Sequence, residues 1–272
     1  MTTPTIKRPS KDRPQSRLRR ILPQGERPPT GVSLGLHHDW PQRGRRSPRL
    51  TNSMYFIMQG LTDSLVQARD RYVQPGAAIL DVGCGEMPYY PVFAGVAGDY
   101  SGADMFPAPN VRYVCPAEAL DIPDESFDVV LSTQVLEHVR DPTKTLSEIG
   151  RVLKPGGIAL VSTHGVWPYH PVPEDYWRWT HEGLRALFID IACFDVLEVV
   201  PNGGTGSCLA TLAAHYTGLL ARNRSASVGR LAAYLVTVIN LLGRAGDRLL
   251  KRYDYPNDQA LILNYLVVAR RR

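Results

Sequence analysis

An apolar run that stops on a carboxylate and is followed by two glycines limits the fold of this chain more than any other feature. The run AILD ends at Asp81, and GCG follows at residues 83–85. A continuous apolar run bounded by glycine is typical of a strand buried on both faces, as in a parallel sheet. Glycine permits a tight turn and lets a ligand approach the main chain. We therefore expect a binding site where this strand ends.

Strand and helix patterns alternate along most of the chain. We expect strands at residues 77–83, 97–105, 111–115, 126–134, 157–165, 194–201 and 261–271, and helices at residues 53–73, 141–153 and 180–190. Asp141 or Thr143 is suited to cap the second of these helices, and Thr180 the third. The sequence LKPGG at residues 153–157 ends a helix. This alternation predicts an α/β fold with a doubly wound, mostly parallel, seven-stranded sheet.

The segment between the last two expected strands breaks the alternation. Residues 203–257 contain two apolar helical patterns, at 208–220 and 230–250, so we expect a helical insertion within an α/β domain of residues 51–272. Its most apolar stretch, residues 231–242, is shorter than the roughly twenty residues that cross a bilayer. The insertion is open to three interpretations: a cap over a ligand site, a helix pair on a membrane surface, or a hairpin packed on the sheet or on a second copy.

Positive charge gathers at the start of the chain. Residues 1–50 hold twelve Lys and Arg against three Asp and Glu, and the remainder holds 19 against 23. This segment is rich in Pro and Arg and cannot bury enough apolar surface to fold, so we expect a disordered basic arm. The arm is either a solvated extension or a patch for anionic lipid or nucleic acid. We expect no secretory signal, because no apolar stretch follows the first charges.

The cysteines indicate a reducing compartment. Cys84, Cys115, Cys193 and Cys208 show neither a CxxC pair nor metal-finger spacing. We therefore expect free thiols, no metal site, and a cytoplasmic protein, with contact to a membrane surface left open.

Several further motifs follow the glycines in a fixed order. They are Asp104, FDVVLS at 127–132, LEH at 136–138 and LKPGG at 153–157. Together with DVGCG at 81–85 they resemble the class I S-adenosylmethionine-dependent methyltransferases, in the branch that contains many small-molecule methyltransferases. The resemblance covers about residues 75–200 and 259–270. It implies a Rossmann-like fold and S-adenosyl-L-methionine as cofactor. Glu137 and His138 are interpreted as structural.

The resemblance also implies roles for single residues. Pro116 stands where many relatives have an Asp, so adenine recognition is left to backbone groups or to Glu118. The implied cofactor contacts are Asp81, Gly83 and Gly85 at the methionine end, Asp104 at the ribose hydroxyls, Ala117 and Glu118 beside the adenine, and Thr133 and Gln134 under the sulfonium.

An acceptor site is expected in STHGVWPYHPVPEDYWRWT, residues 162–180, because this loop is dense in aromatic and titratable side chains. His164 or His170 is the candidate general base, with Asp175 orienting it or serving as the base itself. Alternatively, Asp175 and Arg178 form a salt-bridged corner that holds the following helix. The predicted pocket residues are Trp167, Tyr169, Tyr176 and Trp177.

We predict methyl transfer to a small-molecule acceptor, such as a sugar, lipid-linked or natural-product hydroxyl, amine or carboxylate. A nicotinamide-dependent oxidoreductase is disfavoured, because Pro88 occupies the position of the third small residue of that fingerprint. An RNA methyltransferase is an alternative, although the acidic body disfavours nucleic acid as a partner. Another alternative is a protein that binds the cofactor without catalysing methyl transfer. Membrane contact through the arm or the insertion, and a homodimer, are left open.

Overall fold

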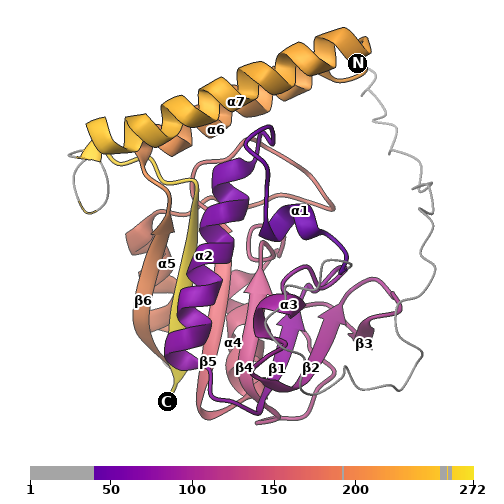
Figure 1. The fold of residues 1–272 in the computed structure, drawn as a ribbon. Helices are drawn as coiled ribbons and strands as arrows, with labels where there is room; N and C mark the ends of the chain where they lie inside the picture. Colours follow the sequence, from indigo (N-terminus) through magenta and orange to yellow (C-terminus); the bar gives the residue numbers. More distant parts are fainter. Residues whose placement is uncertain (1–39, 192, 252–255, 257–258) are drawn as a thin grey trace, which may run out of the picture.

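A seven-stranded sheet forms the centre of the computed structural model, which describes residues 40–191, 193–251, 256 and 259–272 (Figure 1). The strands are β1 (Ala77–Val82), β2 (Ala97–Asp104), β3 (Val111–Val114), β4 (Phe127–Thr133), β5 (Leu153–His164), β6 (Phe194–Asn202) and β7 (Asn264–Arg271). Their order is β3-β2-β1-β4-β5-β7-β6. Only β7 runs antiparallel to its neighbours, β5 and β6. The predicted mostly parallel, doubly wound sheet is confirmed.

The direction in which the chain winds reverses between β1 and β4. After β1 the chain moves outward through β2 to β3, and it then returns to place β4 on the other side of β1. Val82 pairs with Ala103 of β2 and with Ser132 of β4, and Thr133 pairs with Ser162 of β5. The ends of these strands therefore share one border of the sheet, which we call the carboxyl edge. Open α/β sheets bind ligands at such a reversal.

Helices cover both faces of the sheet. On one face lie α2 (Tyr55–Tyr72) and α3 (Tyr90–Phe93), and on the other lie α4 (Pro142–Val152) and α5 (His181–Asp190). Asp141 caps α4 by accepting a hydrogen bond from Lys144 N at 3.0 Å, and Thr180 caps α5 through Gly183 N at 3.1 Å. Buried side chains that form the two core layers include Leu61, Leu65, Ile79, Phe93 and Leu160 on the first face, and Leu80, Val130, Leu146, Leu184 and Phe188 on the second.

The strand β5 begins at Leu153 and not at Gly157, where the sequence placed its start. Leu153 pairs with Phe127, and the register then shifts, so that the next pair joins Val129 to Ile158. The proline and glycines of residues 155–157 thus lie within an irregular start of the strand, where a missing ladder hydrogen bond is tolerated.

Residues 40–50 pack on the domain, which corrects the predicted arm boundary at residue 50. They include the short helix α1 (Arg43–Arg46). The Trp40 indole donates to Met87 O at 2.8 Å, and its ring lies 4.5 Å from that of Tyr90. Arg46 is 6% exposed because its guanidinium donates to the carbonyls of Pro41 and Pro88. The composition of this segment does not show that the hydrogen-bond donors of Arg46 are paired with backbone carbonyls. The rest of the arm, residues 1–39, lies outside the described residues.

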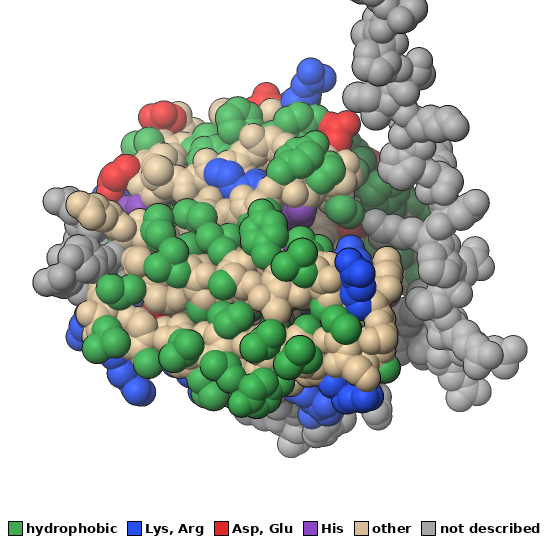
Figure 2. Space-filling model, turned by 90° about the horizontal axis from the view of Figure 1, so that it is seen from above, with side chains coloured by type: hydrophobic (Ala, Val, Ile, Leu, Met, Phe, Trp, Pro, Cys, Tyr) green, Lys and Arg blue, Asp and Glu red, His purple; other side chains and the backbone are tan. Residues whose placement is uncertain are grey.

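Two long helices, α6 (Thr205–Ala221) and α7 (Ala226–Leu249), form a hairpin between β6 and β7. The hairpin lies across the molecule beside the start of α2, and Figure 2 looks down on it (Figure 1). Asn240 of α7 is fully buried and donates to Leu50 O at 2.8 Å and to Asn52 O at 3.0 Å. These contacts fix the hairpin to the chain that precedes α2.

Among the described helices, α7 alone is long and apolar enough to cross a bilayer, and 17% of its most apolar window is buried. The prediction from residues 231–242 underestimated this length, because the helix extends over 24 residues from Ala226 to Leu249. Length and composition alone do not distinguish a span from a surface helix.

We expect a glycine-to-alanine change at Gly206 to destabilise the fold, because the backbones of α6 and α7 touch there. A Cβ at Gly206 would lie 2.4 Å from Asp247 N and 2.5 Å from Gly246 C. Gly206→Ala should lower the free energy of unfolding by about 1–3 kcal/mol in urea denaturation. The control is Gly229→Ala in α7, where nothing lies within 4 Å, and it should leave stability unchanged or raise it by about 0.5–1 kcal/mol. Equal effects of the two changes would contradict this close packing.

Candidate functional site

The two glycines after β1 serve different purposes. Gly83 and Gly85 have φ angles of 69° and 49°, in the left-handed region that favours glycine. A Cβ at Gly83 would lie 2.3 Å from Val135 Cγ2, whereas nothing lies within 4 Å of a Cβ at Gly85. Gly83 thus lets the loop pack against the chain that follows β4. Gly85 borders open space, and a ligand can approach its backbone there.

Asp104 ends β2 with both carboxylate oxygens held by the main chain. Oδ2 accepts a hydrogen bond from Gly85 N at 3.0 Å, and Oδ1 accepts one from Phe106 N at 3.0 Å. Each carboxylate oxygen can accept a second hydrogen bond. Asp104 is partly exposed, so its fixed carboxylate can bind two neighbouring hydroxyl groups.

Asp81 carries a buried oxygen without a partner. Its carboxylate is 1% exposed, and Oδ2 accepts a hydrogen bond from Tyr100 OH at 2.8 Å, while Oδ1 has no hydrogen-bond partner. Burial raises the pKa of Asp81 to about 7, against the opposing effect of the Tyr100 hydrogen bond. A buried, unpaired carboxylate oxygen calls for a donor such as an ammonium group.

Two exposed apolar residues that were not predicted as ligand contacts, Met105 and Phe106, follow Asp104. Met105 is 53% exposed and Phe106 is 58% exposed. Large exposed apolar side chains next to a diol-binding carboxylate can pack against a flat heterocycle. The signal was available, since both residues follow a strand that ends on Asp. Ala117 and Glu118 lie in the turn after β3, where Glu118 Oε1 accepts a hydrogen bond from Arg140 N at 3.1 Å.

Thr133 and Gln134 lie where β4 ends, beside the reversal of the sheet. Thr133 is 8% exposed. Gln134 has a φ angle of 57°, an uncommon conformation for a residue other than glycine. Its backbone N and its Nε2 donate to Ser162 O and Ser162 Oγ, each at 3.0 Å, and its Oε1 is buried without a partner. The side-chain amide is therefore held with one free acceptor.

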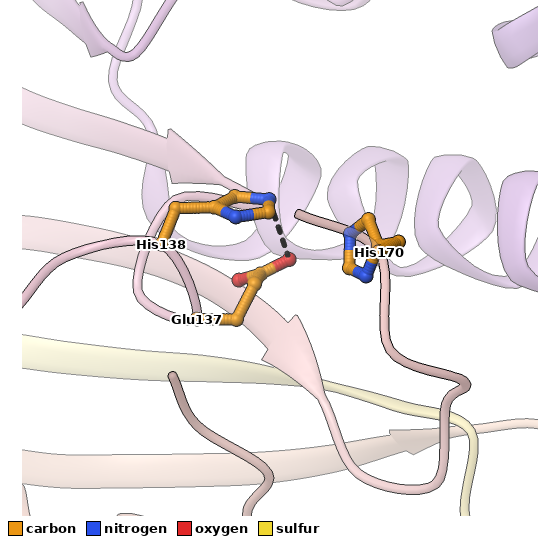
Figure 3. Close-up of side chains that lie close together, drawn as sticks. All are labelled: Glu137, His138 and His170. Atoms are coloured by element: carbon orange, nitrogen blue, oxygen red, sulfur yellow. Dashed lines mark ion pairs between the residues drawn. The ribbon is translucent and has the colours of Figure 1, made fainter. Parts of the chain in front are cut away.

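A buried carboxylate, Glu137, lies among the imidazoles of His138, His164 and His170 beyond the ends of β4 and β5. Figure 3 shows Glu137 with His138 and His170. Glu137 is fully buried, and its Oε2 accepts a hydrogen bond from Thr163 Oγ1 at 3.0 Å. Its Oε1 lacks a hydrogen-bond partner and lies 3.4 Å from His164 Nε2 and 4.0 Å from His138 Nε2. The His170 ring lies 4.9 Å from that of His138 and 5.3 Å from that of His164.

Burial sets the charges of this cluster. It raises the pKa of Glu137 to about 7. It also lowers the pKa of His164 to about 3, assisted by the nearby His170 and Arg178. The pKa of His170 is lowered by burial as well, although the carboxylate of Asp175 opposes this. His164 and His170 are therefore neutral near neutral pH, and a neutral imidazole can accept a proton.

Asp175 forms an ion pair with Arg178. The guanidinium of Arg178 donates to both oxygens of Asp175, at 2.6 and 2.7 Å, and also to the carbonyls of Trp167 and Pro168. Burial would raise the pKa of Asp175, but the hydrogen bonds from Arg178 outweigh it and hold that pKa at about 2. Asp175 Oδ2 accepts a hydrogen bond from His170 N at 2.9 Å and lies 3.5 Å from His170 Nδ1.

The predicted pocket residues do not gather at one place. Trp167 stacks on His164 with ring centroids 5.3 Å apart, and its ring centroid lies 5.1 Å from that of His215 of α6. Trp177 donates to Val139 O at 2.9 Å. Tyr169 is 74% exposed, and Tyr176 is 44% exposed. The structure brings Trp167 to the histidines and leaves the two tyrosines at the surface.

The same cluster brings together atoms that could hold a metal ion. One ligand atom each of Glu137, His138 and His170 lie within 4.8 Å of one another. A carboxylate and two imidazoles suit a divalent transition metal. Sequence spacing gave no such pattern, because His170 comes from a separate loop. The four cysteines, all within the described residues, are free, and three are buried.

Comparison with known proteins identifies the central segment. Residues 80–161, from β1 to β5, match the family model described as "Methyltransferase domain". A Mycolicibacterium smegmatis protein named "Probable S-adenosylmethionine-dependent methyltransferase" is 35% identical over 135 residues, or 45% of this chain and 51% of that protein. The ubiquinone biosynthesis O-methyltransferase of Roseobacter denitrificans is 36% identical over 146 residues, or 45% of this chain and 58% of that protein.

A third relative, the 2-methyl-6-phytyl-1,4-hydroquinone methyltransferase of Synechocystis sp., is 31% identical over 137 residues, or 42% of this chain and 43% of that protein. The chain thus spans about half the length of the curated relatives it matches. Among solved structures, 1,6-didemethyltoxoflavin-N1-methyltransferase of Burkholderia thailandensis, with S-adenosylhomocysteine bound, is 15% identical with a TM-score of 0.48 and 78% of each chain covered.

We expect the His164 imidazole to stay neutral from about pH 5 to pH 8, because burial lowers its pKa to about 3. An unfolded histidine titrates near pH 6.5, so between the two values the unfolded chain binds the additional proton. This group therefore makes stability rise with pH from about 3 to about 6.5. Ring ¹⁵N chemical shifts report the titration, with His164→Gln as the assignment control. A His164 signal that titrates near pH 6.5 would contradict this.

Proposed function

Because the chain belongs to the class I S-adenosylmethionine-dependent methyltransferase family, we propose that it transfers a methyl group to a hydroxyl group of a small-molecule acceptor. One observation carries the proposal: a nucleoside-type cradle and the neutral imidazoles of His164 and His170 lie at neighbouring strand ends of the carboxyl edge. Val82 pairs with Ser132, and Thr133 pairs with Ser162. The two parts of the site are thus about two strand spacings, roughly 10 Å, apart.

The residues at the ends of β1 and β2 fit S-adenosyl-L-methionine. When bound, this cofactor supplies an electrophilic methyl group on a positively charged sulfur. The unpaired, buried Oδ1 of Asp81 suits the ammonium of its methionine part, and the fixed carboxylate of Asp104 suits the two ribose hydroxyls. Met105 and Phe106 can cover the adenine ring, a contact that does not depend on a carboxylate at Pro116.

His170 is the base that the geometry supports best. In the reaction a bond forms between the acceptor oxygen and the methyl carbon, the bond from that carbon to sulfur breaks, and the hydroxyl proton must leave. His170 can take this proton, because its ring is neutral and 31% of its side chain is exposed. His164 is 3% exposed and lies behind Trp167, which makes direct contact with an acceptor harder.

The remaining polar residues position the base. Asp175, with a pKa of about 2, is too weak a base at neutral pH, but it accepts the backbone N–H of His170 and faces its Nδ1. Arg178 in turn fixes Asp175 and the carbonyls of the loop. Positioning of this kind places reacting groups in line and accounts for much of enzymatic rate enhancement.

An aromatic hydroxyl is the acceptor class with the most support. Two relatives are named for quinone-type substrates, one as an O-methyltransferase of ubiquinone biosynthesis and one as a hydroquinone methyltransferase. The indole of Trp167, stacked on His164, supplies an aromatic surface beside the base. A phenolic hydroxyl also needs a weaker base than an aliphatic one, which suits a neutral imidazole.

A cytoplasmic location stays a prediction.

Single-turnover methyl transfer tests the proposal. The protein is held in excess over methyl-labelled S-adenosylmethionine and offered a panel of hydroquinones and catechols. We expect label in the acceptor, and we expect His170→Gln to slow transfer about 10²–10⁴-fold while affinity for S-adenosylhomocysteine is unchanged. The matched control is His181→Gln at the start of α5, which should retain the wild-type rate.

Two outcomes would count against the proposal. Unchanged rates in both His164→Gln and His170→Gln would remove the histidine base. Cofactor binding with no transfer to any acceptor would favour the alternative of a cofactor-binding protein without catalysis.

A further inference from the structure

The outer face of the α6–α7 hairpin is the most apolar exposed surface among the described residues. Eleven of the 19 exposed large hydrophobic side chains belong to this hairpin. Leu220 and Leu249 are 78% and 81% exposed. Figure 2 shows these apolar side chains, in green, spread along both helices. Scattered surface leucines are ordinary, but a contiguous patch of this kind marks a surface for a partner.

The exposed and the buried residues of α7 occupy opposite sides of the helix. Ala232, Val236, Asn240 and Gly243 are buried, and Gly243 packs against Ala210 of α6 and Phe56 of α2. The exposed apolar stripe consists of Leu231, Tyr234, Leu235, Leu241, Leu242 and Leu249. With about 100° per residue, these six side chains span about 120° of the helix surface, and their centre lies about 150° from that of the buried residues. The helix therefore uses one stripe for the fold and presents a second one to the outside.

Basic residues border this apolar stripe. The exposed cations of the hairpin are Arg222, Arg224, Arg230, Arg244, Arg248 and Lys251. In α7, Arg230, Arg244 and Arg248 fall within about 40° of one another on the helix, beside exposed Tyr234 and Leu241 at one border of the stripe. The guanidinium of Arg244 also donates to Tyr55 OH and lies over the Tyr55 ring. The sequence of the hairpin contains a single acid, Asp247, and its carboxylate accepts hydrogen bonds from Ser207 N and Oγ at 2.7 and 2.8 Å. The border of the patch is thus uniformly positive.

We propose that this face docks on the surface of an anionic lipid bilayer. An apolar stripe bordered by arginines is the arrangement of a helix that lies in the membrane interface, with leucines among the acyl chains and guanidinium groups at the phosphates. Docking of two copies through this face would bring like charges together, which disfavours a dimer. A membrane span would remove α7 from α6 and leave buried Asn240 without its carbonyl partners.

The docked orientation brings the acceptor loop close to the lipid. Trp167, which stacks on His164, also contacts His215 of α6, the helix that shares this face. An acceptor carrying an apolar tail could therefore reach the site from the bilayer. This last step rests on the proposed function, whereas docking itself does not.

Vesicle cosedimentation of the full-length protein tests the docking. The vesicles contain phosphatidylcholine with or without about one third phosphatidylglycerol, at low and at high salt. We expect binding to the anionic vesicles that weakens with salt and without phosphatidylglycerol. The combined variant Leu231→Ser, Leu235→Ser, Leu242→Ser should lower the partition coefficient at least about tenfold. These side chains are exposed, so the variant should fold, which circular dichroism verifies.

The control variant carries Val114→Ser and Ile189→Ser, which remove exposed apolar side chains far from the hairpin and should leave binding unchanged. Three results would overturn the proposal. The first is no binding of the wild-type protein to anionic vesicles. The second is a triple variant that binds anionic vesicles as strongly as the wild-type protein, which would assign the binding to another segment. The third is light scattering that shows a dimer for the wild-type protein and a monomer for the triple variant, while neither protein binds vesicles.

Discussion

The pairing of β1 with both β2 and β4 is the constraint on which the rest of the structure depends. It places the chain reversal at the centre of the sheet and brings the ends of three strands to one edge. The hydrogen bond from Gly85 N to Asp104 then ties the loop after β1 to the end of β2. Because parallel strands end at the same edge, residues far apart in sequence meet there and, with the loops that follow the strands, form one cradle.

Two buried carboxylates divide the site into its halves. Asp81 and Glu137 each have one oxygen with a hydroxyl donor and one without a partner, and burial raises each pKa to about 7. An unsatisfied buried oxygen lowers stability, so such groups concentrate where a ligand or a reaction uses them. In the proposed function, Asp81 lies on the cofactor side of the edge, and Glu137 lies among the imidazoles of the acceptor side.

Local patterns predicted the parts of the structure that local physics determines. The alternation of apolar runs located the sheet. Thr180 was predicted as a helix cap, and of the two candidates Asp141 and Thr143 the structure shows that Asp141 accepts the capping hydrogen bond. The imidazole cluster was not predictable in this way, because Glu137, His164 and His170 come from three segments that only the fold brings together. Burial of Arg46 was not predictable either, because its hydrogen-bond partners are backbone carbonyls, which leave no pattern in the sequence.

Calorimetric titration with S-adenosylhomocysteine tests most directly whether the carboxyl edge holds a nucleoside. We expect one binding site per chain in the wild-type protein and an affinity at least about tenfold lower in Asp104→Ala, which loses a charged hydrogen-bonding partner. Asp99→Ala is the matched control, because Asp99 lies in the same strand but contacts Ser101 and Arg112 instead, and it should bind like the wild type. A wild-type protein with no affinity, or an Asp104→Ala variant that binds equally well, would contradict nucleoside binding at the carboxyl edge.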